Sequence, residues 1–443
     1  MKSTLNDRLH SALQSRHQRS IRRSLEPQPH SISHQLELIP LDFSSNDYLS
    51  FSTSSTLRQN FNTRLYLTNV SPFGPSSSRL LDGNTPQHLQ LESHLASFFK
   101  GTSGLLFNSG FDANIGIWST LPGPKDYVLY DRLIHASVHD GLRASRCKPT
   151  QRISFKHNSV PHLQSVLSRL FETDEGVKNG KNNVFIGVES LYSMDGDLCP
   201  LDEMVEVIDR IFGPDQTNVH LIVDEAHSTG LYGPSGRGLT VALSLSKRIL
   251  VRLHTFGKAL ACSGAIVITT PLIRDYLINY ARPLIFSTAM TRMTVLAIST
   301  ATAELETETH RKAVSQLETL ADHLSNLLRE LLLRLNISPV GPDEPRASKD
   351  VITIPEAILI RPKKFFSPII PILSNRPRDL ATYLLNHGIR VRPIGTPTVP
   401  SGREMVRVCL HSEQSVEQVE LLVKLIERWV LGQKKDEVLR ARL

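Results

Sequence analysis

The chain has 443 residues, more than one simple domain usually contains, and 40% of them are hydrophobic and 21% charged, as in ordinary globular proteins. Because no apolar run approaches the ~20 residues that cross a bilayer, and the N-terminus lacks an apolar signal-peptide core, we expect no membrane association. The 50 basic and 43 acidic residues give a net charge of +7, which favours anionic partners.

The distribution of the charges argues against nucleic acid as that partner. The basic residues are scattered, aromatic residues make up only 6% of the chain, and no zinc-ligand spacing occurs. An anionic small molecule such as a coenzyme A thioester fits the same net charge. The four cysteines have neither metal-binding nor paired spacing, so we expect reduced thiols and no metal.

The first 45 residues predict a basic N-terminal helix and a connector to the folded body. From residue 87 onward, helical and β-like runs alternate. We expect strands at 104–107, 127–130, 184–188, 220–224, 249–253 and 265–269, and helices at 87–100, 111–121, 137–146, 160–172, 201–212 and 239–247. This alternation predicts an α/β fold with a mostly parallel sheet covered by helices on both faces.

After residue 290 the pattern changes to a long helix pair that ends near residue 335. A small α/β lobe follows, with strands at 368–373, 389–393 and 405–410 and helices at 378–386 and 415–431. We therefore expect three parts: an N-terminal helix and connector (1–45), a large domain (46–289), and a small C-terminal domain with a polar tail (290–443).

Lys258 lies among small and apolar residues just after a predicted strand, and Asp224 ends another strand 34 residues earlier. A poorly solvated lysine has a lowered pKa and can form a Schiff base, and an aspartate can hold a protonated pyridine nitrogen. Together they indicate pyridoxal 5'-phosphate (PLP). Alone, Asp224 would be interpreted as a helix cap and His227 as incidental.

Other polar residues follow the predicted strands. The hydroxyl of Thr255 can reach a phosphate or simply form a turn, and the backbone amides of Gly110 and Phe111 can bind phosphate at a helix N-terminus. His135 can stack on a pyridine ring or be a structural histidine. Ser193 offers a hydroxyl near a strand end, and the turn after it does not match a calcium loop.

Two arginines of the C-terminal lobe are candidates for binding a substrate carboxylate, because a planar guanidinium suits bidentate contacts. They are Arg392 and Arg407. Arg407 alternates with Val406 and Val408, which predicts that it leaves its strand on the face opposite to the apolar residues.

The chain resembles the α-oxoamine synthase family from about residue 8 to 430. The resemblance is carried by nine motifs in order: Ser45-Asn-Asp-Tyr-Leu, Ser78-Arg-Leu-Leu-Asp-Gly-Asn, Asn108-Ser-Gly-Phe, Asp131-Arg-Leu-Ile-His-Ala-Ser, Ser193-Met-Asp-Gly-Asp, Asp224-Glu-Ala-His, Thr255-Phe-Gly-Lys, Pro283-Leu-Ile-Phe-Ser-Thr and Pro397-Thr-Val-Pro. Family members are fold-type I PLP enzymes and homodimers with shared active sites. They condense an amino acid with an acyl-CoA and lose CO₂.

The resemblance implies a role for each candidate residue. Lys258 is the Schiff-base lysine and the acid/base, Asp224 pairs with the pyridine nitrogen, and His135 stacks on the ring. The side of the phenolic oxygen is contacted by Ser193 and His227.

The phosphate and the substrate have their own sets of residues. Thr255, Gly110 and Phe111 hold the phosphate, and Ser287 or Thr288 reaches in from the partner subunit. Arg407 holds the amino-acid carboxylate, with Arg392 as a second candidate, and Asn46 lies at the substrate mouth.

Within the family, the C-terminal motifs resemble most the 8-amino-7-oxononanoate synthases, which join L-alanine to pimeloyl-CoA in biotin biosynthesis. Two alternatives stay open: a family member with another amino acid or acyl group, and a non-catalytic partner subunit, which would lack the lysine. The last three residues, Ala441-Arg442-Leu443, resemble a peroxisomal address, so the expected location is the peroxisome or the cytoplasm.

Overall fold

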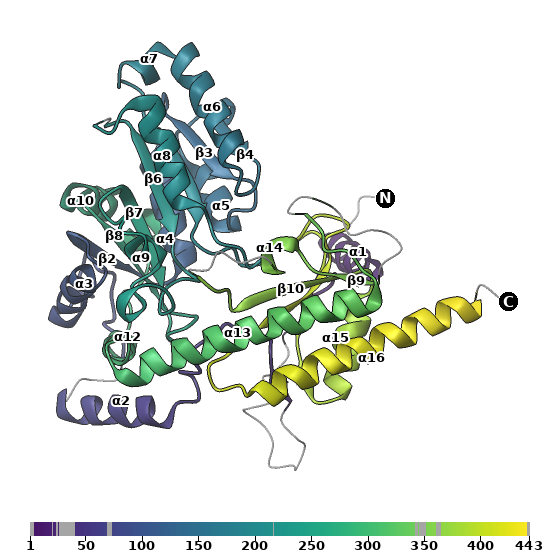
Figure 1. Cartoon of the computed structure of the whole chain (residues 1–443). Helices are drawn as coiled ribbons and strands as arrows, with labels where there is room; N and C mark the ends of the chain where they lie inside the picture. The colour runs from purple at the N-terminus through teal and green to yellow at the C-terminus, as the bar shows by residue number, and fades with distance from the viewer. Residues whose placement is uncertain are drawn as a thin grey trace.

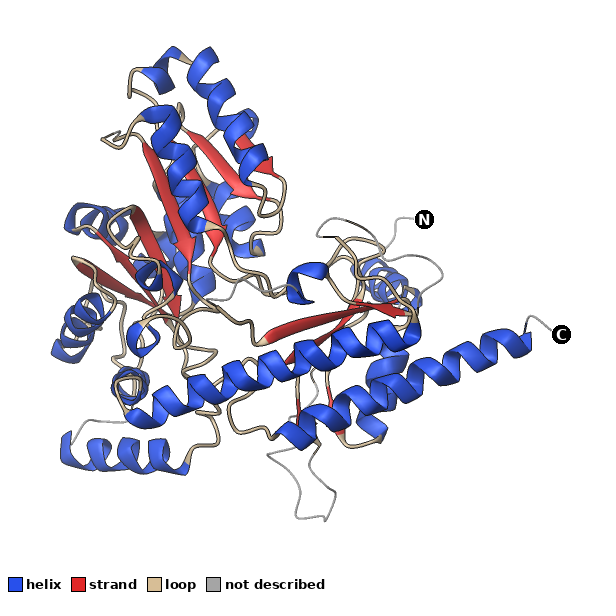
Figure 2. Cartoon of the chain, viewed as in Figure 1, coloured by secondary structure: helices blue, strands red, loops and turns tan. Residues whose placement is uncertain are grey.

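The computed structural model of the chain describes residues 4–19, 21–23, 25, 40–68, 73–215, 217–341, 344, 351–359 and 365–440. Its centre is a seven-stranded sheet in the order β2-β8-β7-β6-β5-β3-β4, drawn in the upper part of Figures 1 and 2. The strands are β2 (Ser103–Phe107), β3 (Tyr127–Asp131), β4 (Arg152–Phe155), β5 (Val184–Glu189), β6 (Val219–Asp224), β7 (Ile249–Thr255) and β8 (Ala265–Thr269). Six of the strands run in one direction, and β8 runs opposite to them. The α/β class and the mostly parallel sheet are confirmed.

Helices cover both faces of this sheet because successive strand residues point to opposite sides. Leu105, Phe185 and Ile222 pack in one apolar cluster, and their neighbours Leu106 and Ile186 pack in the other. Helices α4 (Gly110–Thr120), α5 (Ala136–Ala144), α10 (Pro271–Tyr280) and α11 (Arg282–Ile285) belong to the first face. The second face carries α3 (Pro86–Phe98), α6 (Val160–Thr173), α7 (Glu175–Lys178), α8 (Leu201–Phe212) and α9 (Leu239–Ala242).

A second, four-stranded antiparallel sheet has the order β12-β13-β10-β9. Its strands are β9 (Ile352–Thr353), β10 (Ile369–Ser374), β12 (Arg392–Ile394) and β13 (Met405–Cys409), while β1 (Leu41–Asp42) pairs in parallel with β11 (Ile389–Arg390). The long helix α13 (Glu308–Leu335) runs below the labelled strands β9 and β10 in Figure 1 and lies beside α16 (Val416–Arg440). The pairing of β1 with β11 attaches the start of the folded body to this C-terminal lobe.

The remaining helices are α1 (Leu5–Gln18), α2 (Ser55–Thr68), α12 (Arg292–Glu304), α14 (Glu356–Leu359) and α15 (Pro377–Asn386). Helix α2 packs against α12 at the lower left of Figure 1. Within the described ranges, no helix is both long and apolar enough to span a membrane. The predicted address at 441–443 lies outside the described residues, so its role stays a prediction.

Three predicted elements are wrong in extent. The helix expected at 415–431 continues to Arg440, because no proline interrupts the polar residues that follow it. The helix expected at 239–247 stops at Ala242, because Ser244 adopts a left-handed conformation with φ 61° that ends the helix. The strand expected at 389–393 is divided, because its first two residues pair with β1 and the rest pair with β13. Strand β4 was not predicted. It is a four-residue edge strand, and only one of its residues is fully buried.

Candidate active site

The predicted residues gather in a cavity of about 370 Å³ at the carboxyl ends of β5, β6 and β7, beside the N-terminus of α4. This is the edge where open parallel sheets bind ligands. Eight of the candidates line it: Asn46, Gly110, Phe111, His135, Asp224, His227, Thr255 and Lys258. They come from five separate stretches of the chain, so the fold itself assembles the site.

Lys258 lies on a tight turn directly after β7. The amide of Ala261 donates to the carbonyl of Lys258 at 2.9 Å, and Ala261 has a φ of 50°. Removal from water lowers the pKa of the Lys258 ammonium, while the negative charges of Asp224 and Glu189 act in the opposite direction. A lysine with a lowered pKa has the free amine that Schiff-base chemistry needs.

Asp224 ends β6 with its carboxylate facing the cavity. Oδ2 accepts from the side-chain amide of Asn114 at 2.9 Å, and Oδ1 accepts from the backbone amide of Ala226 at 2.9 Å. The amide of Asn114 also donates to Ser137 at 3.0 Å. Both oxygens of Asp224 are therefore fixed, and the carboxylate presents a directed negative charge to the cavity.

The N-terminus of α4 forms an anion cradle in the same cavity. Ser109 caps the helix by accepting from the amide of Asp112 at 3.0 Å, and the next free amides are those of Gly110 and Phe111. A Cβ on Gly110 would lie 2.5 Å from Cγ2 of Thr255, so only glycine leaves this wall open. Free amides, a helix dipole and a hydroxyl together suit a phosphate group.

His135 forms another wall and also caps α5. Its Nδ1 accepts from the amide of Ser137 at 3.3 Å, which leaves the ring proton on Nε2 in the neutral form. Burial lowers the pKa of His135. The negative charge of Asp224 raises this pKa, and the positive charge of Lys258 lowers it further. The ring of Phe111 meets it edge-on at 6.4 Å between centroids. A neutral imidazole face suits stacking on an aromatic ring.

His227 begins a chain of polar contacts that leads away from the cavity. Its Nδ1 lies 2.7 Å from the hydroxyl of Tyr48, which donates to Oδ1 of Asn46 at 3.2 Å. The same oxygen of Asn46 accepts from Arg407 at 2.9 Å. Burial and the positive charges of Lys258 and Arg407 lower the pKa of His227 well below its usual value, so the ring is neutral.

Arg407 is buried but does not itself line the cavity. Its Nε donates to the backbone carbonyl of Ser193 at 2.6 Å. In the described part of the chain no carboxylate lies within ion-pairing distance of this guanidinium, although a buried charge normally needs a counter-ion. Two nitrogens of Arg407 are bonded within the protein, to the carbonyl of Ser193 and to Asn46, and these two contacts position the guanidinium.

Three other candidates lie outside the cavity. Ser287 and Thr288 line a separate narrow space, where the carbonyl of Thr288 accepts from Asn108 at 2.8 Å. Arg392 faces Arg407 in the pairing of β12 with β13, so both leave the sheet on one face, but its side chain is exposed. These residues do not reach the cavity within one copy of the chain.

Sequence reasoning missed three residues of the site. Glu189 lines the cavity at the end of β5, where burial and then the charge of Asp224 raise its pKa well above the usual value. Asn114 holds Asp224 from the second turn of α4, and Tyr48 holds His227. The strand-end position of Glu189 was the one available signal, because the other two act through contacts between distant segments.

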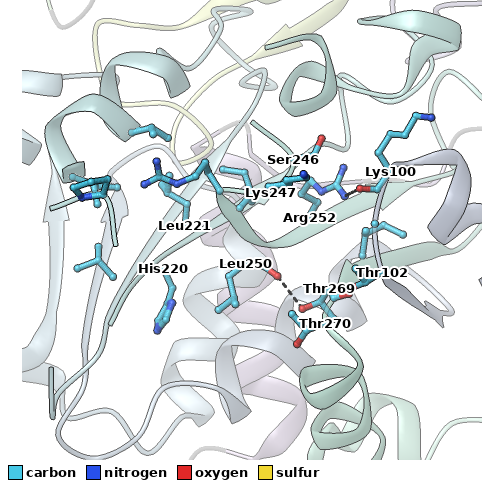
Figure 3. Close-up of a pocket in the computed structure, with 18 residues that line it drawn as sticks. Lys100, Thr102, His220, Leu221, Ser246, Lys247, Leu250, Arg252, Thr269 and Thr270 are labelled. Carbon is cyan, nitrogen blue, oxygen red and sulfur yellow. Dashed lines mark hydrogen bonds between the residues drawn. The ribbon is translucent and has the colours of Figure 1, made fainter. Parts of the chain in front are cut away.

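A larger cavity of about 500 Å³ lies at the opposite edge of the sheet (Figure 3). Several of its polar side chains are hydrogen-bonded within the protein. Arg252 donates to the carbonyls of Phe99 and Lys100, and Thr269 donates to Leu250, as the dashed line marks. It contains none of the predicted residues. Among the described residues, no group of three or more His, Cys, Asp or Glu side chains is placed to hold a metal ion.

The set in the smaller cavity fits PLP. It offers an amine for the aldehyde, a fixed carboxylate for the pyridine nitrogen, an imidazole for the ring face and a helix N-terminus for the phosphate. Each of these groups comes from a different element, and each group has the chemistry that its part of the cofactor requires.

Known proteins place the chain in context. A family model described as aminotransferase class I and II matches residues 39–426. The 8-amino-7-oxononanoate synthase of Emericella nidulans is 41% identical over 435 residues, which are 98% of each chain. The aminoacyl transferase sphA of Aspergillus fumigatus is 34% identical over 385 residues, 86% of this chain and 79% of that protein.

A solved structure agrees in fold. The serine palmitoyltransferase from S. paucimobilis with bound PLP superposes with a TM-score of 0.74, covering 96% of this chain and 98% of that one, at 22% identity. At this level of identity the likeness supports the fold alone.

Proposed function

The chain belongs to the class I and II aminotransferase family and, within it, to the PLP-dependent α-oxoamine synthases, and we propose that it joins L-alanine to pimeloyl-CoA. The products would be 8-amino-7-oxononanoate, CoA and CO₂. One observation carries the choice of substrates: the relative that is 41% identical over 98% of both chains bears the name of this activity. The loss of CO₂ would make the condensation irreversible.

Each residue of the cavity would have a separate role in this reaction. When bound, PLP supplies an electron-accepting ring that stabilises a carbanion at the amino-acid Cα. The amine of Lys258 removes the Cα proton and returns a proton after CO₂ has left. When PLP is bound, Asp224 would keep the pyridine nitrogen protonated, and the neutral ring of His135 would hold the cofactor ring from one side.

The amino acid would bind through the series of hydrogen bonds that connects His227, Tyr48, Asn46 and Arg407. The guanidinium of Arg407 has no carboxylate partner among the described residues, and it is held by Ser193 and Asn46. A carboxylate from the amino acid would complete its bonding, because guanidinium and carboxylate form paired hydrogen bonds. Arg392, on the same face of the sheet, would add positive charge at the outer side.

A second copy of the chain would complete the site. Phe286, which precedes Ser287, is 70% exposed, and the candidate site residue Phe111 is 43% exposed. Exposed aromatic side chains favour an interface. In the homodimer, Ser287 or Thr288 of each copy would reach the phosphate in the other. Sedimentation analysis tests whether the protein is a dimer. To test whether the two subunits share their active sites, the Lys258→Ala variant is mixed with the Ser287→Ala, Thr288→Val variant. If they do, hybrid dimers should regain activity, because one site then has an intact Lys258 and an intact pair of hydroxyl groups.

The proposed substrates are tested with a panel of L-alanine, glycine and L-serine against pimeloyl-CoA, palmitoyl-CoA and acetyl-CoA. Release of free CoA and the mass of the product are measured, with the Lys258→Ala variant as the blank. We expect alanine with pimeloyl-CoA to give the highest kcat/KM. A preference for serine with a long unsubstituted acyl chain would instead favour the second candidate function, which is the same reaction with other substrates. The similarity to the aminoacyl transferase sphA supports this candidate. The presence of Lys258 in the cavity argues against a non-catalytic partner subunit.

A further inference from the structure

A second, smaller cavity of about 250 Å³ adjoins the candidate active site. It lies between α2, the loop before it, the turn after Lys258 and α12. Cys262 lines both cavities. Because Lys258 and Cys262 belong to one tight turn, the segment that presents the lysine to the first cavity also forms a wall of the second.

The walls of this second cavity are apolar in effect. Phe51, Leu57, Phe61 and Leu260 are the large hydrophobic residues of the lining. Burial raises the pKa of the Cys262 thiol to about 12, so it remains protonated and behaves as a small apolar group.

The hydroxyl groups of the lining are already hydrogen-bonded within the protein. Thr300 donates to the carbonyl of Leu296 at 2.8 Å, and Thr53 donates to that of Ser50 at 3.0 Å. Ser52 donates to Asp47, and Ser54 accepts from the amide of Leu57. None of them needs a polar ligand.

Arg58 on α2 is the one charged residue of the lining. In the part of the chain that the structure describes, its guanidinium has no ion-pair or hydrogen-bond partner. The nearby carboxylates of Asp47 and Glu413 are engaged with Ser52 and Thr53 and do not line the cavity. The cavity therefore combines hydrocarbon walls with one free cation at its edge.

We propose that this second cavity holds the acyl chain of the thioester and that Arg58 binds a carboxylate at the far end of that chain. The inference rests on the proposed function and deepens it, because it assigns the acyl chain and the distal carboxylate of an ω-carboxylic thioester to particular residues. A chain attached to a carbonyl beside Lys258 passes Cys262, lies along Phe51 and Leu57, and ends at the guanidinium. Both cavities together have the size of an ordinary ligand site, ~300–1,000 Å³.

The test compares pimeloyl-CoA with heptanoyl-CoA, which has seven carbons but no distal carboxylate. Their affinities for the holoenzyme are measured by titration calorimetry without an amino acid, so that no turnover is needed. Arg58→Gln should weaken pimeloyl-CoA about tenfold and leave heptanoyl-CoA unchanged. Arg64→Gln is the matched control, because it removes the same charge from the same helix and Arg64 does not line the cavity.

A second variant tests where the acyl chain of the substrate lies. Ala297→Phe, on α12, narrows the cavity and should weaken both seven-carbon thioesters while sparing acetyl-CoA. An equal effect of Arg58→Gln on both ligands, or none, overturns the assignment of Arg58. Unchanged affinities in Ala297→Phe overturn the placement of the chain. A wild-type enzyme that turns over only serine and palmitoyl-CoA would refute the proposed function separately, because the binding comparison does not depend on turnover.

Discussion

The hydroxyl of Tyr48 lies 2.7 Å from Nδ1 of His227 and connects the wall of the cavity to a buried arginine. Because Tyr48 also donates to Asn46, which accepts from Arg407, the positions of His227 and of the guanidinium are coupled. Desolvation raises the pKa of Tyr48 well above its usual value, so the hydroxyl keeps its proton. The coupling thus works through hydrogen bonds between a neutral phenol and a neutral imidazole.

Tyr48→Phe should therefore impair both stability and binding of the amino acid. It leaves Nδ1 of His227 without a partner, which costs about 1–3 kcal/mol of unfolding free energy. It also loosens Asn46, so we expect KM for the amino acid to rise about tenfold. Tyr232→Phe is the control, because that buried hydroxyl donates to the carbonyl of Phe366 away from the cavity. Equal kinetic effects of the two variants would contradict the coupling.

Lys258→Ala should abolish covalent attachment of the cofactor. Reduction of the wild-type holoenzyme with borohydride should fix PLP on the peptide that contains Lys258, and the variant should show no such peptide. Turnover should fall by at least about a thousandfold, since the variant loses both the Schiff base and the acid/base group. Lys247→Ala removes an exposed lysine at the other edge of the sheet and should change neither result.

The sequence predicted those parts of the fold and of the site that depend on residues close together in the chain. Alternating apolar runs predicted six strands of the central sheet. Asp224 and Lys258 were recognisable because one ends a strand and the other closely follows one. Contacts between distant segments were not predictable. Asn114 reaches Asp224, and Tyr48 reaches His227, only after α4 and the N-terminal segment have packed on the sheet. For the same reason, the pairing of β1 with β11 was not foreseen.

The ion-pair cluster around His157 should make stability depend on pH in the alkaline range. Nδ1 lies 2.9 Å from Asp131 and Nε2 lies 2.8 Å from Asp197. Burial works against the charged form, but the two carboxylates prevail and raise the pKa of His157 to about 10. A folded pKa above the unfolded value of about 6.5 gives stability that is fully present below pH 6.5 and is lost as pH rises toward 10.

His157→Asn should remove this contribution, which is on the order of a few kcal/mol. Urea unfolding of wild type and variant between pH 6 and pH 10 measures it. The difference between the two free energies should be largest near pH 6 and shrink toward pH 10. His220→Asn is the control, because burial lowers the pKa of His220, the opposite direction from His157, so its difference in free energy should stay constant as pH rises toward 10. A constant difference across the range would show that His157 is not charged in the folded protein.

The close approach of Gly110 to Thr255 should determine the affinity for the phosphate of the cofactor. In Gly110→Ala the new Cβ would meet Cγ2 of Thr255 at 2.5 Å, whereas the next atom, Cβ of Thr255, lies at 3.7 Å. The clash should shift the first turn of α4 and weaken PLP binding about tenfold. Thr255→Ser removes that methyl group and keeps the hydroxyl. The double variant Gly110→Ala, Thr255→Ser should therefore regain most of the affinity, measured by absorbance titration of the dialysed protein. If the double variant binds PLP as weakly as Gly110→Ala alone, the loss comes from the backbone of Gly110 and not from its contact with Thr255.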